Sequence, residues 1–172
     1  MQVLHRNPEF NSFVERWRPW HIKGWPGRQL AVLQPELKRV MAAIYKEIEI
    51  SVASADVWAA IRDYRAIHRI VPQIECRMDG DARIIIFPDG RIAREVLVGI
   101  DDEHRRLVYA EPGGRFITRN GAMQVVELSE GRCRLVWTND LLPDAFAAMV
   151  AGNMDRGPVT MKQNLEAGVR AH

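Results

Sequence analysis

The amino-acid sequence predicts an α+β fold in which a curved antiparallel sheet of about seven strands wraps around a long C-terminal helix. Three observations support this prediction. An alternating first strand is followed by two short helical segments, then by six apolar segments separated by turn residues, and finally by a long segment with helical periodicity. An antiparallel meander needs one face covered, and the amphipathic C-terminal helix is available to cover it.

The first strand is predicted within "IYKEIEISV", where apolar and polar residues alternate imperfectly from residue 44 onward. A short helix follows, with Ser54 as a suitable N-cap and with Val57, Trp58 and Ile61 forming an apolar stripe. A second short helix is predicted in "RAIHRIVP". It should end before Pro72, because a proline disfavours helical geometry in the residue that precedes it.

The middle of the chain reads as a series of hairpins. Further strands are predicted at approximately residues 73–79, 82–87, 91–100, 105–111, 116–128 and 132–140. The dipeptides Asp79-Gly80, Asp89-Gly90 and Glu130-Gly131 are hairpin-turn signals that separate some of these strands.

The last segment, "PDAFAAMVAGNMDRGPVTMKQNLEAGV", is predicted to be helical. Its periodic positions, at spacings of three or four, are Phe146, Met149, Asn153, Gly157, Met161 and Leu165. The Gly157-Pro158 pair should kink or split this helix, because proline removes a backbone donor.

The head of the chain differs from the rest. Residues 1–43 hold seven Lys or Arg and three Asp or Glu, whereas the remainder holds 17 and 19. We interpret residues 1–43 as an N-terminal extension, either poorly ordered or absent from a natural product that starts at Met41, and residues 44–172 as the main domain. Alternatively, "WRPWHIKGWPG" is an aromatic and basic binding arm.

Several classes of function lack support in the sequence. It contains no apolar run of the roughly 20 residues that cross a bilayer and no signal-peptide core, so we expect a cytoplasmic protein. Cys76 and Cys133 then read as buried thiols rather than a disulfide. The main domain has no basic patch for nucleic acid, and no motif indicates a cofactor. The five histidines are too scattered to indicate a metal site.

Three stretches resemble the START/Bet v 1-like (SRPBCC) superfamily, and most closely its bacterial polyketide cyclase/dehydrase-like branch. They are "IYKEIEISVASADVWAAIRDYRAIHRIVPQI", "GRIAREVLVGIDDEHRRLVYAEPGG", and "CRLVWTNDLLPD" together with "MKQNLEAG". The resemblance covers about residues 44–169. It implies a helix-grip fold with a hydrophobic cavity, and it is specific for the fold rather than for the function. Gly113-Gly114 resembles the cavity-gate turn of related receptors and reads equally well as an ordinary turn.

An Arg-Glu pair, Arg94-Glu95, interrupts the otherwise apolar strand "RIAREVLVGID". Successive strand residues point to opposite faces, so one of the two charges is expected to point inward. The resemblance implies that it is Glu95. A buried carboxylate requires a partner, and we expect Arg119 or Asn120 to supply it. A solvent-facing pair on an edge strand is the alternative.

Further cavity residues are predicted from the same alternation. The candidate ligand-binding residues are Glu95, Trp137, Tyr109, His68, Arg119, Phe146, Met149 and Met161. Ordinary core packing is the competing interpretation for the aromatic and methionine side chains. His68 is placed near the cavity mouth, where its near-neutral pKa would suit proton transfer.

The sequence therefore predicts a domain that binds a small hydrophobic molecule, lipid-like or polyketide-like and aromatic. The first alternative is a cyclase or dehydratase that uses Glu95, His68 or Tyr109 as acid or base, which requires several polar groups to converge in the pocket. The second is a protein-interaction or chaperone-like domain, which would expose an apolar patch. The sequence names neither a specific ligand nor an oligomeric state.

Overall fold

A computed structural model gives the structure of the chain and describes residues 41–168. The interpretation of residues 1–43 as an extension therefore falls almost entirely outside the described residues. The elements are β1 (Ala42–Ile50), α2 (Ser54–Arg62), the 3₁₀ helix η1 (Tyr64–Arg69), β2 (Glu75–Asp79), β3 (Ala82–Ile86), β4 (Ile92–Asp101), β5 (Arg106–Ala110), β6 (Thr118–Ser129), β7 (Arg132–Leu142), the 3₁₀ helix η2 (Asp144–Phe146) and α3 (Ala147–Glu166).

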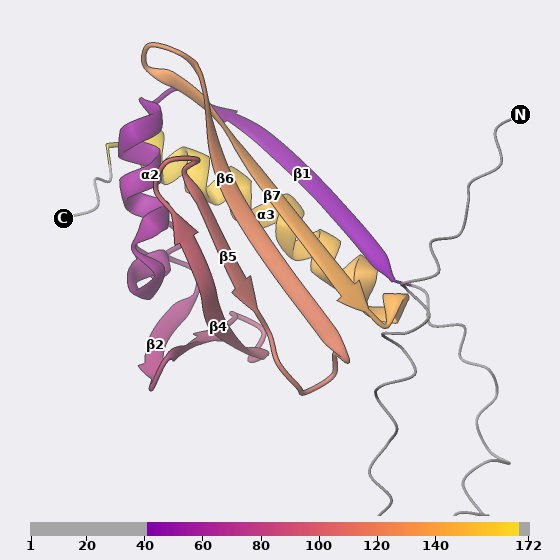
Figure 1. Cartoon of the computed structure of the whole chain (residues 1–172). Coiled ribbons are helices and arrows are strands. Elements are labelled where there is room, and N and C mark those ends of the chain that lie inside the picture. Colours follow the sequence, from indigo (N-terminus) through magenta and orange to yellow (C-terminus); the bar gives the residue numbers. More distant parts are fainter. Residues whose placement is uncertain (1–40, 169–172) are drawn as a thin grey trace, which may run out of the picture. The chain divides into compact units, whose positions relative to one another are not determined.

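All seven strands form one sheet in the order β1-β7-β6-β5-β4-β3-β2. Every neighbouring pair is antiparallel. The strands from β2 to β7 follow one another as a meander, and β1 joins its last strand at the edge, where it lies alongside β7 in Figure 1. The predicted order of the elements along the chain and the helix-grip architecture are confirmed.

Glycine permits the tight turns between the strands. Gly80, Gly90 and Gly131 have φ values of 59°, 79° and 69°, in the left-handed region that other residues rarely occupy. They connect β2 to β3, β3 to β4, and β6 to β7. The three turns predicted from Asp-Gly and Glu-Gly dipeptides are therefore confirmed.

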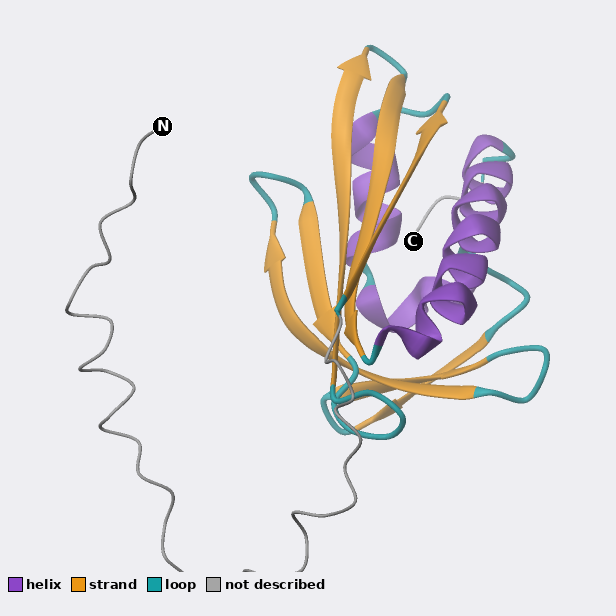
Figure 2. Cartoon of the chain, turned by 90° about the vertical axis from the view of Figure 1, so that its right-hand side faces the viewer, coloured by secondary structure: helices purple, strands orange, loops and turns teal. Residues whose placement is uncertain are grey.

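The helix α3 covers the inner face of the sheet. Figure 2 shows the strands running beside and beneath this helix, with the shorter helix on the same side. α3 contacts β1 and β7. Its buried residues are Val150, Met154, Pro158, Met161 and Leu165.

The prediction that Gly157-Pro158 would split the last helix is wrong, because α3 continues through Pro158 as one helix. Burial of an amphipathic face contributes more to helix stability than intrinsic propensity does, and Pro158 is itself buried in that face. The predicted stripe is correct for Met161 and Leu165. Asn153 and Gly157 lie beside the buried face and border a pocket.

The helix α2 buries Val57, Trp58 and Ile61, as its stripe predicts. Ser54 is not its N-cap, however. Ala53 occupies that position, and the Ser54 hydroxyl donates a hydrogen bond of 2.9 Å to the Glu127 carboxylate on β6. A long-range acceptor competes here with local capping, and sequence spacing does not reveal that acceptor.

The core consists of two clusters of buried side chains. One lies around α2, η1 and the C-terminal half of α3, and the other joins Phe116 and Leu141 to Val150 and Met154. Trp137 packs against both clusters. Both cysteines are free thiols: Cys133 is buried, which raises its pKa to about 11, while Cys76 is only partly buried. The thiols expected at these positions are confirmed.

Candidate functional site

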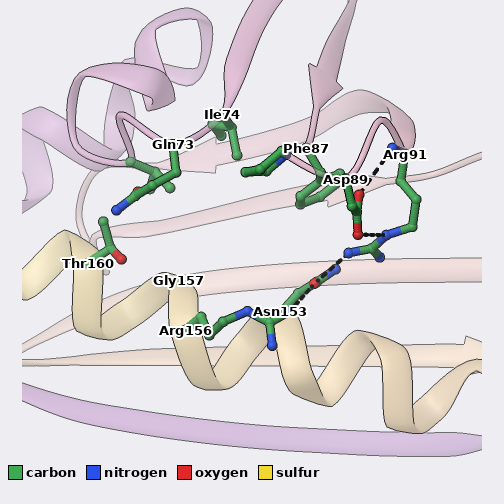
Figure 3. Close-up of a pocket in the computed structure, with 11 residues that line it drawn as sticks. Gln73, Ile74, Phe87, Asp89, Arg91, Asn153, Arg156, Gly157 and Thr160 are labelled. Atoms are coloured by element: carbon green, nitrogen blue, oxygen red, sulfur yellow. Dashed lines mark hydrogen bonds and ion pairs between the residues drawn. The ribbon is translucent and has the colours of Figure 1, made fainter.

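Two adjoining pockets lie between α3, the segment that follows η1, and the sheet. The outer pocket has a volume of about 310 Å³ and the inner pocket about 70 Å³. Figure 3 shows the outer pocket, with residues of α3 facing those that follow η1 and β3. Both pockets are lined by Val71, Ile74, Phe87, Asn153 and Gly157, so the outer pocket leads to the inner one. The inner pocket is also lined by Ile67, Arg83, Ile85, Glu95, Tyr109, Arg119, Met123, Trp137, Met154 and Met161.

Glu95 faces the interior of the domain and lines the inner pocket. It is 4 % exposed, while the neighbouring Arg94 is exposed and pairs with Asp79. Alternation along β4 explains the difference, because adjacent strand residues point to opposite faces. The predicted inward orientation of Glu95 is confirmed, and its role as a ligand anchor stays a prediction.

The partner of Glu95 is Arg83, which is 3 % exposed. Its Nε and Nη2 atoms lie 2.8 and 2.7 Å from the same Oε2 atom of Glu95. The remaining terminal nitrogen, Nη1, donates a bond of 3.0 Å to the backbone carbonyl of Tyr64, and the guanidinium carbon lies 4.1 Å from the centroid of the Tyr64 ring. Within residues 41–168, no hydrogen bond reaches Oε1 of Glu95, so this oxygen is available as an acceptor in the inner pocket.

The partners predicted for Glu95 are wrong. Arg119 is buried, but its Nε donates 3.0 Å to Oδ1 of Asn139, and its Nη1 forms an ion pair with Glu111. Asn120 is exposed on the other face of β6. Arg83 stands directly opposite Glu95 in the β3–β4 hairpin, where their Cα atoms are register partners. A two-residue turn at Asp89-Gly90 would place Glu95 opposite Ile84 instead. The observed hairpin, in which the Phe87 N–H bonds to the Arg91 carbonyl, is shifted by one residue, so the turn signal alone does not give this pairing.

Tyr109 and Trp137 form the back of the inner pocket, and the Trp137 indole N–H donates a hydrogen bond of 2.9 Å to the Tyr109 hydroxyl. Two glycines allow these rings their positions. A Cβ at Gly121 would lie 2.2 Å from the Tyr109 ring, and one at Gly157 would lie 2.8 Å from the Trp137 ring. Both side chains therefore line the inner pocket, as predicted, in positions that larger residues at 121 and 157 would disturb.

The two tyrosines beside Arg83 remain protonated at neutral pH. Burial, together with the nearby Glu95 charge, raises the pKa of Tyr109 above its usual range. Burial also raises the pKa of Tyr64 to about 12, although the Arg83 charge opposes this rise. A phenol with a raised pKa keeps its proton at neutral pH, so it can donate a hydrogen bond and does not act as a base.

The remaining predicted residues are not brought together. Met161 is 1 % exposed and lines the inner pocket. Met149 lines a third pocket of about 20 Å³, which shares Phe87 and Asn153 with the other two and is also lined by Arg119. Phe146 packs edge-to-face on Phe116, with ring centroids 5.4 Å apart, and is not a lining residue of these pockets.

The placement of His68 at the cavity mouth is wrong. His68 is exposed on η1 and lines none of the three pockets. The 3₁₀ helix turns Ala66 and Ile67 inward instead, which directs the next side chain outward. Sequence reasoning also missed lining residues, namely Val71, Ile74, Arg83, Phe87, Arg91, Asn153, Met154 and Arg156. Several of these lie in loops or at element ends, where alternation carries no signal.

Residues 41–168 contain no cluster of three or more His, Cys, Asp or Glu side chains that could hold a metal ion. None of the helices described there is long and apolar enough to cross a membrane.

A comparison with protein families matches residues 41–166 to the family described as polyketide cyclase/dehydrase and lipid transport. This match spans well over half of the 172 residues. The chain belongs to this family. The resemblance to the START/Bet v 1-like superfamily is thereby confirmed, together with the fold that it implies. No curated protein sequence matches the chain.

Solved structures of the same fold come from bacteria and plants. An uncharacterised protein from Bacillus thuringiensis aligns with a TM-score of 0.65 and 20% identity, over 71% of this chain and 97% of its own. Norcoclaurine synthase from Thalictrum flavum, in complex with dopamine and hydroxybenzaldehyde, aligns with a TM-score of 0.59 and 15% identity, over 76% of this chain and 89% of its own. The di-domain ARO/CYC protein BexL from the BE-7585A biosynthetic pathway aligns with a TM-score of 0.63 and 13% identity, over 73% of this chain and 46% of its own. Such low identities show a shared fold alone.

Proposed function

We propose that the domain binds a small molecule with an apolar body in the two adjoining pockets. The observation that carries this proposal is an apolar passage, walled by Val71, Ile74 and Phe87, that ends at a buried carboxylate with one open oxygen. Ligand sites commonly combine apolar walls with a few placed polar groups, in volumes from about 300 Å³ upward. The membership in a family of cyclases and lipid-transport proteins supports the same proposal.

Binding can be tested with the neutral fluorescent probe N-phenyl-1-naphthylamine. We expect the wild-type protein to enhance its fluorescence saturably, and Ile74→Gln to weaken its affinity roughly ten-fold, because Ile74 lines both pockets. The matched control is Ile117→Gln, since Ile117 is 65 % exposed and lines neither pocket. A wild-type protein that leaves the fluorescence unchanged would refute the proposal. Native mass spectrometry of the freshly purified protein would identify a retained ligand.

Glu95 is proposed as the anchor for a donor group of the ligand. Arg83 occupies only one of its carboxylate oxygens, and the other is available to accept a hydrogen bond in the inner pocket. We expect Glu95→Gln to weaken the binding free energy of 2-naphthol, measured by displacement of the probe, by about 1–3 kcal/mol. The reason is the loss of a hydrogen bond to a charged acceptor. Displacement by 2-methoxynaphthalene, which has no donor, should change much less.

Arg94→Gln is the control for this experiment, because Arg94 adjoins Glu95 in the chain but is exposed. If Arg94→Gln impaired binding of 2-naphthol and Glu95→Gln did not, the anchor would be assigned to the wrong face. If neither variant had an effect, the ligand would contact only the apolar walls.

A second candidate function is acid catalysis of a cyclase or dehydratase type. The observation that favours it is the convergence of Tyr109, Glu95 and Arg119 on the inner pocket, with Tyr109 held as a proton donor. Glu95 is a weaker candidate for the base, since two nitrogens of Arg83 already occupy one of its carboxylate oxygens. Catalysis predicts that a bound polyketide-like ligand is consumed over time, whereas simple binding predicts that it is recovered unchanged.

A further inference from the structure

The mouth of the outer pocket carries a pair of arginines that the apolar passage does not explain. Arg91, after β3, and Arg156, on α3, both donate hydrogen bonds to Oδ1 of Asn153, at 3.2 and 3.1 Å. Figure 3 shows the three side chains meeting at one end of the pocket, where Arg91 also bonds to Asp89. Two positively charged groups thus converge on one neutral amide oxygen.

The charges that line the site do not cancel. The outer pocket, the inner pocket and the small pocket beside Met149 are lined together by five arginines and three carboxylates, with no lysine or histidine: Arg83, Arg91, Arg115, Arg119, Arg156, Asp89, Glu95 and Glu111. This leaves an excess of two positive charges.

One of the two excess charges lies at the outer pocket, which Arg91, Arg156 and Asp89 line. Arg83 and Arg119 are paired inside with Glu95 and Glu111, and Arg91 is paired with Asp89 at 2.6 Å. Arg156 lines the outer pocket and, among the described residues, forms no ion pair with a carboxylate, whereas Arg115 lines only the small pocket beside Met149. The outer pocket thus holds two guanidinium groups and one carboxylate, so an anion there would meet a net positive charge.

From this geometry we infer that the ligand carries a carboxylate, which Arg91 and Arg156 hold at the mouth while its apolar body extends past Ile74 and Phe87. This inference rests on the proposed function and adds the chemical class of the ligand. A planar guanidinium fork matches the two oxygens of a carboxylate, and bonds between charged groups are stronger than neutral ones. The outer pocket, at about 310 Å³, has room for a head group and part of the body.

The test measures how well three eight-carbon compounds displace N-phenyl-1-naphthylamine: octanoate, 1-octanol and octyl phosphate. Each is compared between the wild type and Arg156→Gln, so that differences in hydrophobicity among the compounds cancel. We expect Arg156→Gln to weaken the affinity for octanoate by about three- to ten-fold, the range for an ionic contact near the surface. The affinity for 1-octanol should stay the same. Raising the salt concentration should weaken the affinity of the wild type for octanoate but not for 1-octanol.

The matched control is Arg106→Gln, which removes the same charge from an exposed position on β5 that lines none of these three pockets. Equal losses of octanoate binding in Arg106→Gln and Arg156→Gln, or equal losses for octanoate and octanol, would overturn the inference. If Arg156→Gln weakened the affinity for octyl phosphate more than the affinity for octanoate, the head group would be a phosphate, and the assignment of a carboxylate would be overturned. Absence of probe binding to the wild type would instead refute the proposed function together with the inference. The two failures are therefore distinguishable.

Discussion

Met161→Asp should unfold the domain. Met161 is 1 % exposed on the face of α3 that packs against the sheet, and it also lines the inner pocket. The substitution removes buried apolar area and places a carboxylate in the interior of the domain, where the nearby Arg83 and Arg119 are already paired with Glu95 and Glu111. Each effect costs several kcal/mol. The expected loss, about 5 kcal/mol or more, equals the whole stability of many small domains. Circular dichroism and urea unfolding would measure it.

Val159→Asp is the control on the same helix. Val159 is 44 % exposed, so the same new charge remains in water and should change the stability by no more than about 0.5 kcal/mol. A Met161→Asp protein with a wild-type urea midpoint would show that α3 presents a different face to the sheet. Unfolding of both variants would instead indicate sensitivity of the helix to charge in general.

Arg83→Met should be nearly as damaging, for a different reason. The substitution keeps an unbranched apolar chain but leaves the Glu95 carboxylate buried without its ion-pair partner. Breaking one side of a buried pair costs about 3–5 kcal/mol, because an uncompensated charge remains. Urea unfolding at neutral pH would measure the change. Arg94→Met, at an exposed position on the next strand, should have little effect.

The double variant Arg83→Met/Glu95→Leu separates the charge from the packing. If the unpaired carboxylate causes the loss, removing it should restore most of the stability, since apolar replacements of buried pairs are often neutral or better. A double variant as unstable as Arg83→Met would assign the loss to packing against Tyr64 and Tyr109, whose rings flank the guanidinium. For the same reason Glu95→Gln should also destabilise the domain, because it leaves Arg83 buried without a charged partner.

Local patterns in the sequence determined the order and kind of the elements. Alternation in "IYKEIEISV", the Asp-Gly and Glu-Gly turns, and the periodicity before and after Met161 each depend on residues close together in the chain. For the same reason alternation alone indicated that either Arg94 or Glu95 points inward. The resemblance to the superfamily then favoured Glu95, and the burial of that side chain agrees.

Only the tertiary structure decided the partners of these residues. Pairing of β3 with β4 places Arg83 against Glu95, twelve residues apart, and packing of α3 over the sheet places Asn153 and Arg156 beside Arg91, more than sixty residues away. Burial in the α3 face likewise holds Pro158 within a continuous helix, against its local propensity. Three predictions were wrong for a shared physical reason: the capping role of Ser54, the placement of His68 at the cavity mouth and the pairing of Arg119 with Glu95. The long-range hydrogen-bond partner or open face that a polar side chain meets is fixed by how distant segments pack, and spacing along the chain does not encode it.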